Sequence, residues 1–219
     1  MPTTTPPTTE PLLLLREGRR RFFAAQGFAR DGGYDDPWAE ASFGPVPYAI
    51  PNIRARAEAL RVHDLHHVLT GYDADWRSES SISAWELGSG GGGPYAYAWF
   101  IALFGLWVGL WVSPATTWRA FLRGRGSRNL YGQADPSPWL ERSVGDVRRA
   151  LAVRDGPRPA TLLDVGLFGL WTLAATALAA VFVLGSPLLV VLATARRFAH
   201  RRPGACPWTC MGSGTAASG

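Results

Sequence analysis

The sequence predicts an all-α protein: a helical metal-motif region followed by two apolar membrane helices, which a basic amphipathic linker joins. Three observations favour this fold class. Residues 54–70 have the pattern of a helix with clear ends, and neither residues 95–112 nor residues 165–195 contain a charge. Uncharged apolar runs of about 18 or more residues are typical of helices that span a bilayer. We therefore expect an integral membrane protein.

Residues 1–30 are predicted to begin as a disordered segment and to continue as an interfacial helix. The stretch PTTTPPTT, residues 2–9, can bury almost no apolar surface. The leucines at 12–15, the arginines at 19–21 and the phenylalanines at 22–23 are typical of a helix that lies in a membrane interface. An ordinary helix that covers the fold is the alternative.

Residues 31–93 form the predicted metal-motif region. Residues 31–52 are rich in Gly, Asp and Pro and are predicted to be loop. Asn52 can cap a helix that ends at Gly71, a residue suited to the left-handed position after a helix. A second short helix is expected over SESSISAWEL, residues 78–87, before a Gly-rich break.

Two segments are predicted to lie in the membrane. The first membrane helix covers residues 94–114 and contains Gly105 and Gly109 in a G-x3-G motif, which is typical of close helix packing. The second covers residues 161–197, with a kink expected at Gly185–Pro187. A buried core hairpin is the alternative to two membrane segments.

The linker between these segments, residues 115–160, carries nine Arg against four acidic residues. Ser143 and Asp146 indicate the start of an amphipathic helix in it. This helix either lies on anionic headgroups or belongs to a solvated connector. Residues 198–219 are predicted to be a disordered tail. The net charge of +5 comes without a compact basic motif or a stacking platform, so we expect no nucleic-acid partner.

The stretch HDLHHVLTGYDADWRSE, residues 63–79, holds three of the four histidines. His63 and His67 are one helical turn apart and share a face, and Asp64 borders that face because it lies three positions before His67. The turn at Gly71 can return a second helix so that Glu79 closes the site. The pattern leaves His66, with Asp73 and Asp75, as ordinary surface residues.

The predicted metal ligands are therefore His63, Asp64, His67 and Glu79. Two imidazoles with one or two carboxylates suit Zn²⁺ when a water fills an open position, and they also suit Fe²⁺ or Mn²⁺. Such an ion could polarise a substrate oxygen or activate a water. The alternative is a polar helix end whose histidines gain from the helix dipole without a metal. The pattern assigns no catalytic residue.

The pattern H-D-x-x-H, eleven further residues and then Glu resembles the signature of the coenzyme Q (ubiquinone) biosynthesis protein four family. The flanking HVLTGY and the pair Trp85-Glu86 add to the likeness, which covers residues 54–87. Ser78 departs from the family pattern, which has Gly before the Glu. The two uncharged runs suggest a divergent, membrane-integral member.

The resemblance implies an all-helical, membrane-associated protein that holds a divalent metal, with zinc favoured, through His63, Asp64, His67 and Glu79. It implies a role in the biosynthesis of ubiquinone or a related prenylated quinone: binding of a prenylated ring precursor at the bilayer surface, and its oxidative decarboxylation. The alternative is a non-catalytic, lipid-binding scaffold that assembles other quinone-biosynthesis proteins.

The expected partners are therefore a prenylated quinone precursor or another isoprenoid lipid, the membrane, and other quinone-biosynthesis proteins. The expected location is the bacterial inner (cytoplasmic) membrane, where two helices would make the protein integral.

Overall fold

The computed structural model describes residues 10–43, 46–133, 135–185 and 187–199. Within these residues the chain is mostly helical, as predicted, with eight α-helices, two 3₁₀-helices and one two-stranded sheet. The predictions of disorder for residues 2–9 and for the tail from residue 200, which contains Cys206 and Cys210, lie outside the described residues.

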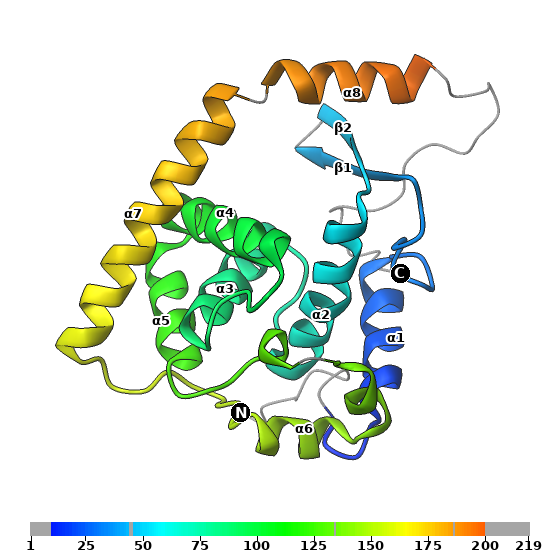
Figure 1. Cartoon of the computed structure of the whole chain (residues 1–219). Helices are drawn as coiled ribbons and strands as arrows, with labels where there is room; N and C mark the ends of the chain where they lie inside the picture. The colour runs from blue at the N-terminus through cyan, green and yellow to red at the C-terminus, as the bar shows by residue number, and fades with distance from the viewer. Residues whose placement is uncertain (1–9, 44–45, 134, 186, 200–219) are drawn as a thin grey trace, which may run out of the picture.

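A bundle of four helices forms the centre of the molecule (Figure 1). Its members are α2 (Arg54–Thr70), α3 (Trp76–Gly88), α4 (Ala96–Val112) and α5 (Pro114–Gly124). Helix α3 packs against both α4 and α5, and it is buried along most of its length. Trp85 of α3, Phe121 of α5 and Leu106 of α4 are fully buried where these helices meet. The two helices predicted for the metal motif are therefore both present.

The N-terminal end of α2 differs from the prediction. The helix begins at Arg54 after Ile53, which provides no side-chain cap. Asn52, predicted as the cap, instead donates its side-chain amide to the backbone carbonyls of residues 33, 34 and 36. The loop before the helix needs donors for its carbonyls, and the Asn52 amide satisfies them. The C-terminal end is as predicted, because Gly71 adopts the left-handed conformation with φ 75°.

Helix α1 (Leu15–Gln26) covers the bundle instead of lying in a membrane interface. Leu15, Phe22 and Phe23, the side chains expected to contact lipid, are buried in the core that α1 shares with α2. The arginines of α1 lie on the outside, where Arg16 pairs with Glu141. The structure thus supports the alternative of an ordinary covering helix.

Residues 31–52 were predicted to be loop, and this is wrong for residues 38–43 and 46–51. They form an antiparallel hairpin of β1 (Trp38–Phe43) and β2 (Val46–Pro51). The hairpin packs on helix α8, where Thr194 hydrogen-bonds the Ala49 backbone and Arg197 pairs with Glu40 at 2.9 Å. Because this partner lies about 145 positions along the chain, the short Pro-interrupted strands carry little local signal.

Helix α4 packs closely on the bundle through the predicted G-x3-G motif. A Cβ atom at Gly105 would lie 2.0 Å from the Ser83 hydroxyl oxygen, and one at Gly109 would lie 2.5 Å from the Thr117 hydroxyl oxygen. Ser83 belongs to α3 and Thr117 to α5. The small residues therefore let α4 approach two helices of the same bundle.

We expect Gly105→Ala to lower the free energy of unfolding by about 1–3 kcal/mol, because the added methyl group overpacks the α3–α4 contact. Gly166→Ala in the exposed helix α7 is the matched control. No atom lies within 4 Å of a Cβ built there, so this change should stabilise the helix by up to about 1 kcal/mol. Thermal unfolding in detergent compares the two. Equal melting temperatures would contradict the close contact.

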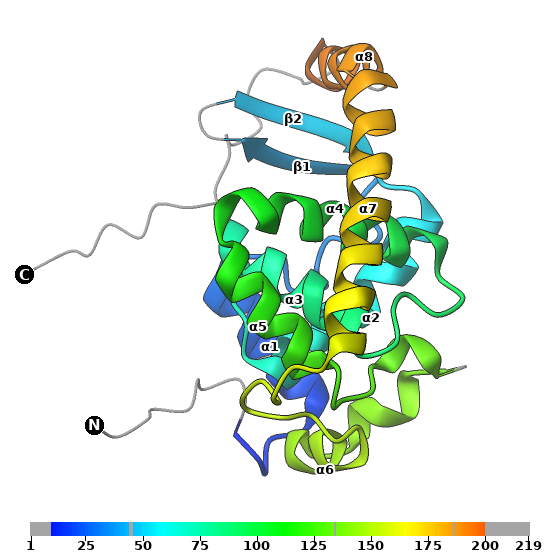
Figure 2. The same ribbon diagram turned by 90° about the vertical axis from the view of Figure 1, so that its left-hand side faces the viewer.

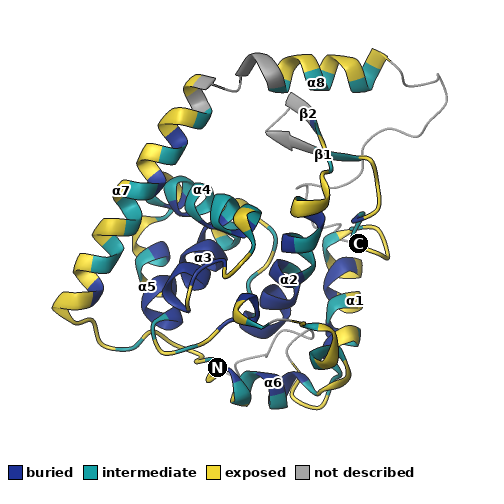
Figure 3. Cartoon of the chain, in the orientation of Figure 1, coloured by how far each residue is buried: buried dark blue, intermediate teal, exposed yellow. Residues whose placement is uncertain are grey.

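Helix α7 (Leu162–Gly185) lies along the bundle, and helix α8 (Pro187–Ala199) runs at an angle to it above the hairpin (Figures 1 and 2). The segment predicted over 161–197 is therefore two helices that meet at the expected break. Most of α7 is exposed or half-buried (Figure 3), including Leu173 at 70% and Val181 at 72%. Residues 162–182 are long and apolar enough to cross a bilayer, at about 31 Å for 21 residues.

The prediction of two membrane-spanning helices is not supported. Among the described residues, α7 alone meets the length and hydropathy of a span. Helix α4 has 17 residues, and it buries Ala98, Ala102 and Leu106 against the bundle. One side of this apolar helix is buried in the bundle. Hydropathy alone does not distinguish such a helix from one that contacts lipid.

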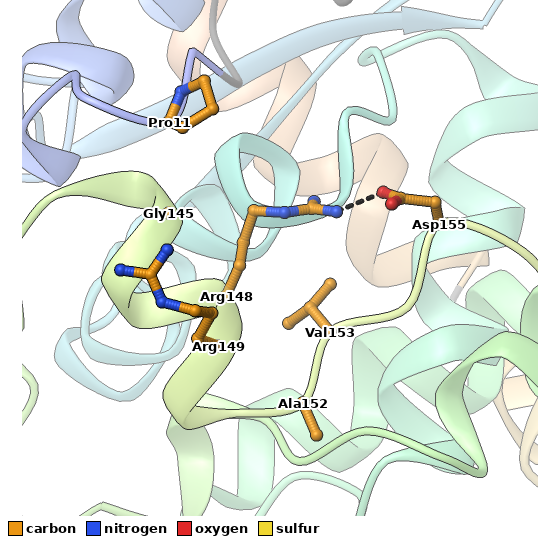
Figure 4. Close-up of a pocket in the computed structure, with 7 residues that line it drawn as sticks. All are labelled: Pro11, Gly145, Arg148, Arg149, Ala152, Val153 and Asp155. Atoms are coloured by element: carbon orange, nitrogen blue, oxygen red, sulfur yellow. Dashed lines mark hydrogen bonds and ion pairs between the residues drawn. The ribbon is translucent and has the colours of Figure 1, made fainter.

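The basic linker contains α5, the 3₁₀-helices η2 (Leu130–Gly132) and η3 (Ser137–Glu141), and α6 (Val144–Ala150). Ser143 caps α6, as predicted, by accepting the Asp146 N–H at 3.1 Å. Arg148 and Arg149 of α6 line a surface pocket of about 430 Å³ (Figure 4). Each pairs with a nearby carboxylate, and Arg148 also donates to the Leu69 carbonyl at the end of α2. This part of the linker is therefore packed against the bundle.

Candidate metal centre

The turn between α2 and α3 places the histidines and Glu79 together. Asp75 caps α3 by accepting the backbone N–H groups of Arg77 and Ser78 at 2.9 and 3.1 Å. The Ser78 hydroxyl donates to the other Asp75 oxygen at 2.7 Å. Ser78, which departs from the family pattern, thus strengthens the cap that positions Glu79 in the first turn of α3. Asp75 is a capping residue with a definite structural role.

A buried arginine fastens the same turn from the linker. Arg123 of α5 donates to the Thr70 carbonyl at 2.9 Å and lies over the Tyr72 ring at 5.1 Å. The last carbonyls of α2 have no partner within the helix, so this cation and Arg148 satisfy them. The turn that brings Glu79 to the histidines is therefore held by residues far along the chain.

Three of the four predicted ligands converge. The Nε2 atoms of His63 and His67 are 3.2 Å apart. The Glu79 carboxylate approaches the first at 3.3 Å and the second at 3.4 Å. One ligand atom from each residue can be chosen so that all three lie within 4.8 Å of one another. The helix spacing and the Gly71 turn thus bring these side chains together as predicted.

The outer partners of the two rings decide which nitrogen faces the cluster. His67 Nδ1 lies 2.9 Å from the Tyr72 carbonyl oxygen, and His63 Nδ1 lies 2.9 Å from a Glu86 carboxylate oxygen. A carbonyl and an ionised carboxylate only accept hydrogen bonds, so both Nδ1 atoms must donate. In the neutral rings the Nε2 lone pairs therefore face each other and Glu79. This electron-rich arrangement needs a cation or a proton between them.

The spacing of these atoms fits a tetrahedral metal ion. Zinc binds imidazole nitrogen and carboxylate oxygen at about 2.0–2.1 Å, so two ligands of a tetrahedron lie about 3.3–3.4 Å apart. The separation of 3.2 Å between the two Nε2 atoms matches that edge, and each Nε2 atom has a different Glu79 oxygen near it, at 3.3 and 3.4 Å. Three protein ligands would leave one position for water or substrate. The donor set can therefore hold a metal ion, and its composition does not select zinc over iron or manganese.

Asp64, the fourth predicted ligand, is held outside this group. Its carboxylate accepts the Tyr34 hydroxyl at 2.5 Å. Burial raises the pKa of the Asp64 carboxyl, while the neighbouring His63 and the Tyr34 hydrogen bond oppose that rise. Tyr34 comes from the Gly-rich segment before the hairpin, and the Arg61 guanidinium lies 5.1 Å from its ring centre. In this structure Asp64 belongs to the surroundings of the site, next to the ligand group.

Two buried residues at the site escaped the sequence prediction. His66 was predicted to be a surface residue, but it is completely buried and lies against Trp85 and Tyr131. Its Nδ1 donates to Glu86 at 2.7 Å, and its Nε2 accepts the Leu130 N–H at 3.0 Å. Glu86 is also fully buried. One signal in the sequence could have indicated this burial. If the second helix returns beside α2, Trp85 and Glu86 can face the histidines, His66 included.

The charges in the cluster stabilise one another. Burial alone would raise the pKa of the Glu86 carboxyl, but His63 and His66 outweigh it and lower the pKa to about 2. His67 and His63 likewise outweigh burial at Glu79 and lower the pKa of that carboxyl below its ordinary value. Both carboxylates are therefore negative at neutral pH.

The site is closed on one side and open on another. The Phe22 ring of α1 stacks on His67, with ring centres 4.7 Å apart, and both histidine ligands are buried. The Glu79 side chain is 33% exposed, so Glu79 is the member of the group that solvent reaches. Asp73 lies away from the cluster, where it accepts a hydrogen bond from Gln26 at 3.4 Å.

Comparison of the chain with protein-family models, with curated proteins and with solved structures found no match. What the site can do is therefore argued from its own geometry and from the resemblance of its motif.

Proposed function

We propose that this chain is a metal-dependent membrane protein of ubiquinone, or related prenylated quinone, biosynthesis. The observation that carries the proposal is the convergence of two imidazole lone pairs and a carboxylate on the motif that resembles the coenzyme Q biosynthesis protein four family. Zinc is the proposed ion, with iron and manganese as alternatives. The proposed location is the bacterial inner membrane, with α7 as the membrane anchor.

The proposed substrate is a prenylated aromatic ring that carries a carboxylate. The bound ion would polarise the ring carboxylate or a phenolic oxygen at the open position. His63, His67 and Glu79 would hold the ion, and Phe22 would limit access of water on the α1 side. Oxidative decarboxylation of the ring is the proposed reaction, with its oxidant supplied from outside the chain.

An apolar groove on the surface supports the proposal of a substrate with a hydrocarbon chain. Its volume is about 580 Å³, and it lies among β2, the start of α2, α4, α7 and α8. Ile53, Phe100 and Phe182 are among its lining side chains. Such a lining suits a hydrocarbon chain, and the exposed apolar surface of α7 begins beside it. We propose that the prenyl tail of the substrate lies here.

A non-catalytic scaffold that binds prenyl lipid and assembles other quinone-biosynthesis proteins is the second candidate. The firm attachment of the α2–α3 turn to the linker favours it, because a metal that only reinforces this turn would be structural. A structural ion has four protein ligands, whereas a catalytic ion keeps an open position. The three-residue group found here favours the enzyme.

A rescue experiment tests the proposed function. The chain is expressed in a bacterial strain whose ubiquinone synthesis stops at the carboxylated ring precursor, and ubiquinone is measured by chromatography. We expect the wild type to restore ubiquinone and His67→Ala to leave less than about a tenth of it, since that change removes a metal ligand. Full rescue by His67→Ala would show that the ligand group is not needed for this role. Failure of the well-expressed wild type would contradict the quinone assignment.

A further inference from the structure

We propose that Glu86 is a positioning residue of the metal centre: it fixes the orientation of His63 and places a buried carboxylate behind that ligand. This inference rests on metal binding as proposed above and concerns residues outside the ligand group. Glu86 lies two turns after Glu79 on α3 and is completely buried. It reaches the metal ligands through His63 alone.

The hydrogen bonds around Glu86 determine which nitrogen of His66 and of His63 carries the proton. The chain of hydrogen bonds begins at the Leu130 backbone N–H, which can only donate, so His66 Nε2 must accept. His66 Nδ1 therefore carries the proton and donates to Glu86 Oε1 at 2.7 Å. The same oxygen accepts from His63 Nδ1 at 2.9 Å, which leaves the His63 Nε2 lone pair to face the ion. The Leu130 amide thus determines the tautomer of His66, and the Glu86 carboxylate determines that of the metal ligand His63.

The 3₁₀ turn that supplies this amide is itself fastened to α3. Asn129 donates its side-chain amide to the Glu86 carbonyl at 3.2 Å and to the Gly91 carbonyl at 2.9 Å. It also accepts the Tyr131 N–H at 3.1 Å. The position of Leu130 relative to Glu86 is therefore constrained from both sides, and the chain of hydrogen bonds is preorganised.

The charge of Glu86 explains why the site suits a divalent ion. Its second oxygen, Oε2, is buried and has no partner at hydrogen-bond distance within the part of the chain that the structure describes, although the Tyr131 hydroxyl interacts with this carboxylate. A buried carboxylate with an unpaired oxygen is costly unless positive charge lies nearby. Glu86 and Glu79 contribute negative charge on two sides of the His63 ring. A bound divalent cation would offset that charge.

Zinc affinity of the full-length protein in detergent tests this role. A chelator competition titration gives the dissociation constant, and circular dichroism checks helix content. We expect Glu86→Gln to weaken zinc binding by about 10–100-fold, because outer partners of metal-bound histidines have effects of that size. His66→Gln should also weaken zinc binding. Glu58→Gln, an exposed change on the same helix as His63, is the control and should leave affinity unchanged.

The outcomes separate this inference from the proposed function. If the wild type binds no divalent ion, the metal-based function itself is contradicted. If the wild type binds zinc and folded Glu86→Gln binds within twofold of it, the role of Glu86 alone is overturned. Should Glu86→Gln fail to fold, ¹⁵N NMR of the wild-type zinc protein decides. We expect protonated Nδ1 in both His63 and His66, and a protonated Nε2 in either ring would contradict the hydrogen-bond chain.

Discussion

Replacing His67 with alanine should lower the affinity for zinc by more than about 100-fold. Changes in outer partners alone cost about 10–100-fold, and His67 supplies one of the three converging ligand atoms. The measurement is a chelator competition titration on folded protein. Asp73→Asn is the matched control, because Asp73 lies on the same turn but bonds Gln26 instead of the cluster. Equal affinities for wild type and His67→Ala would contradict the proposed centre.

The same titration distinguishes the two predicted carboxylate ligands. Glu79→Gln should weaken zinc binding as strongly as His67→Ala, since the Glu79 carboxylate lies within 3.4 Å of both Nε2 atoms. Asp64→Asn should have a smaller effect, because its carboxylate accepts the Tyr34 hydroxyl. A larger effect of Asp64→Asn than of Glu79→Gln would show that Asp64 leaves Tyr34 and binds the ion.

Asp164→Ala is expected to lower the free energy of unfolding by about 1.5–3 kcal/mol. Asp164 is fully buried at the start of α7 and pairs with Arg125 at 2.9 Å and Arg158 at 2.6 Å. It also accepts the Thr161 N–H at 2.9 Å. Because both arginine side chains are 27% exposed and can be hydrated once Asp164 is removed, the effect is that of lost hydrogen bonds to charged groups. The proposed membrane anchor would lose the ion pair between its start and Arg125, which follows α5.

Asp155→Ala provides the control for this prediction. Asp155 also pairs with an arginine, Arg148, but its side chain is 92% exposed. Exposed ion pairs contribute about 0–1 kcal/mol, so the melting temperature should change little. Thermal unfolding of both variants in detergent or lipid nanodiscs makes the comparison. If both lower the melting temperature equally, Asp164 does not hold α7 to the bundle.

Local sequence signals predicted the ligand-bearing part of the fold well. The one-turn spacing of His63 and His67, and the stop at Gly71, depend only on helix geometry and on the left-handed conformation of one glycine. The cap of α6 at Ser143 is another local signal, and it is also confirmed. Such features could be predicted because the residues that determine them are neighbours in the sequence.

Features that depend on distant partners could not be predicted. His66 is buried because Leu130, 64 positions away, donates to it. The strands over residues 38–43 and 46–51 have their partner in α8, and Asn52 hydrogen-bonds the preceding loop instead of capping α2. Helix α4 was predicted to span the membrane because it is apolar. An apolar composition is equally suited to a helix that packs against a bundle, so hydropathy alone could not distinguish the two.

The most direct test of the account is the zinc content of purified wild-type protein after dialysis against metal-free buffer. Mass spectrometry of the metal, together with protein concentration, gives the number of ions per chain. We expect one ion per wild-type chain, and less than about a tenth of an ion in His67→Ala, which lacks one ligand of the group. A folded wild-type protein that retains no zinc, iron or manganese would contradict the proposed metal centre.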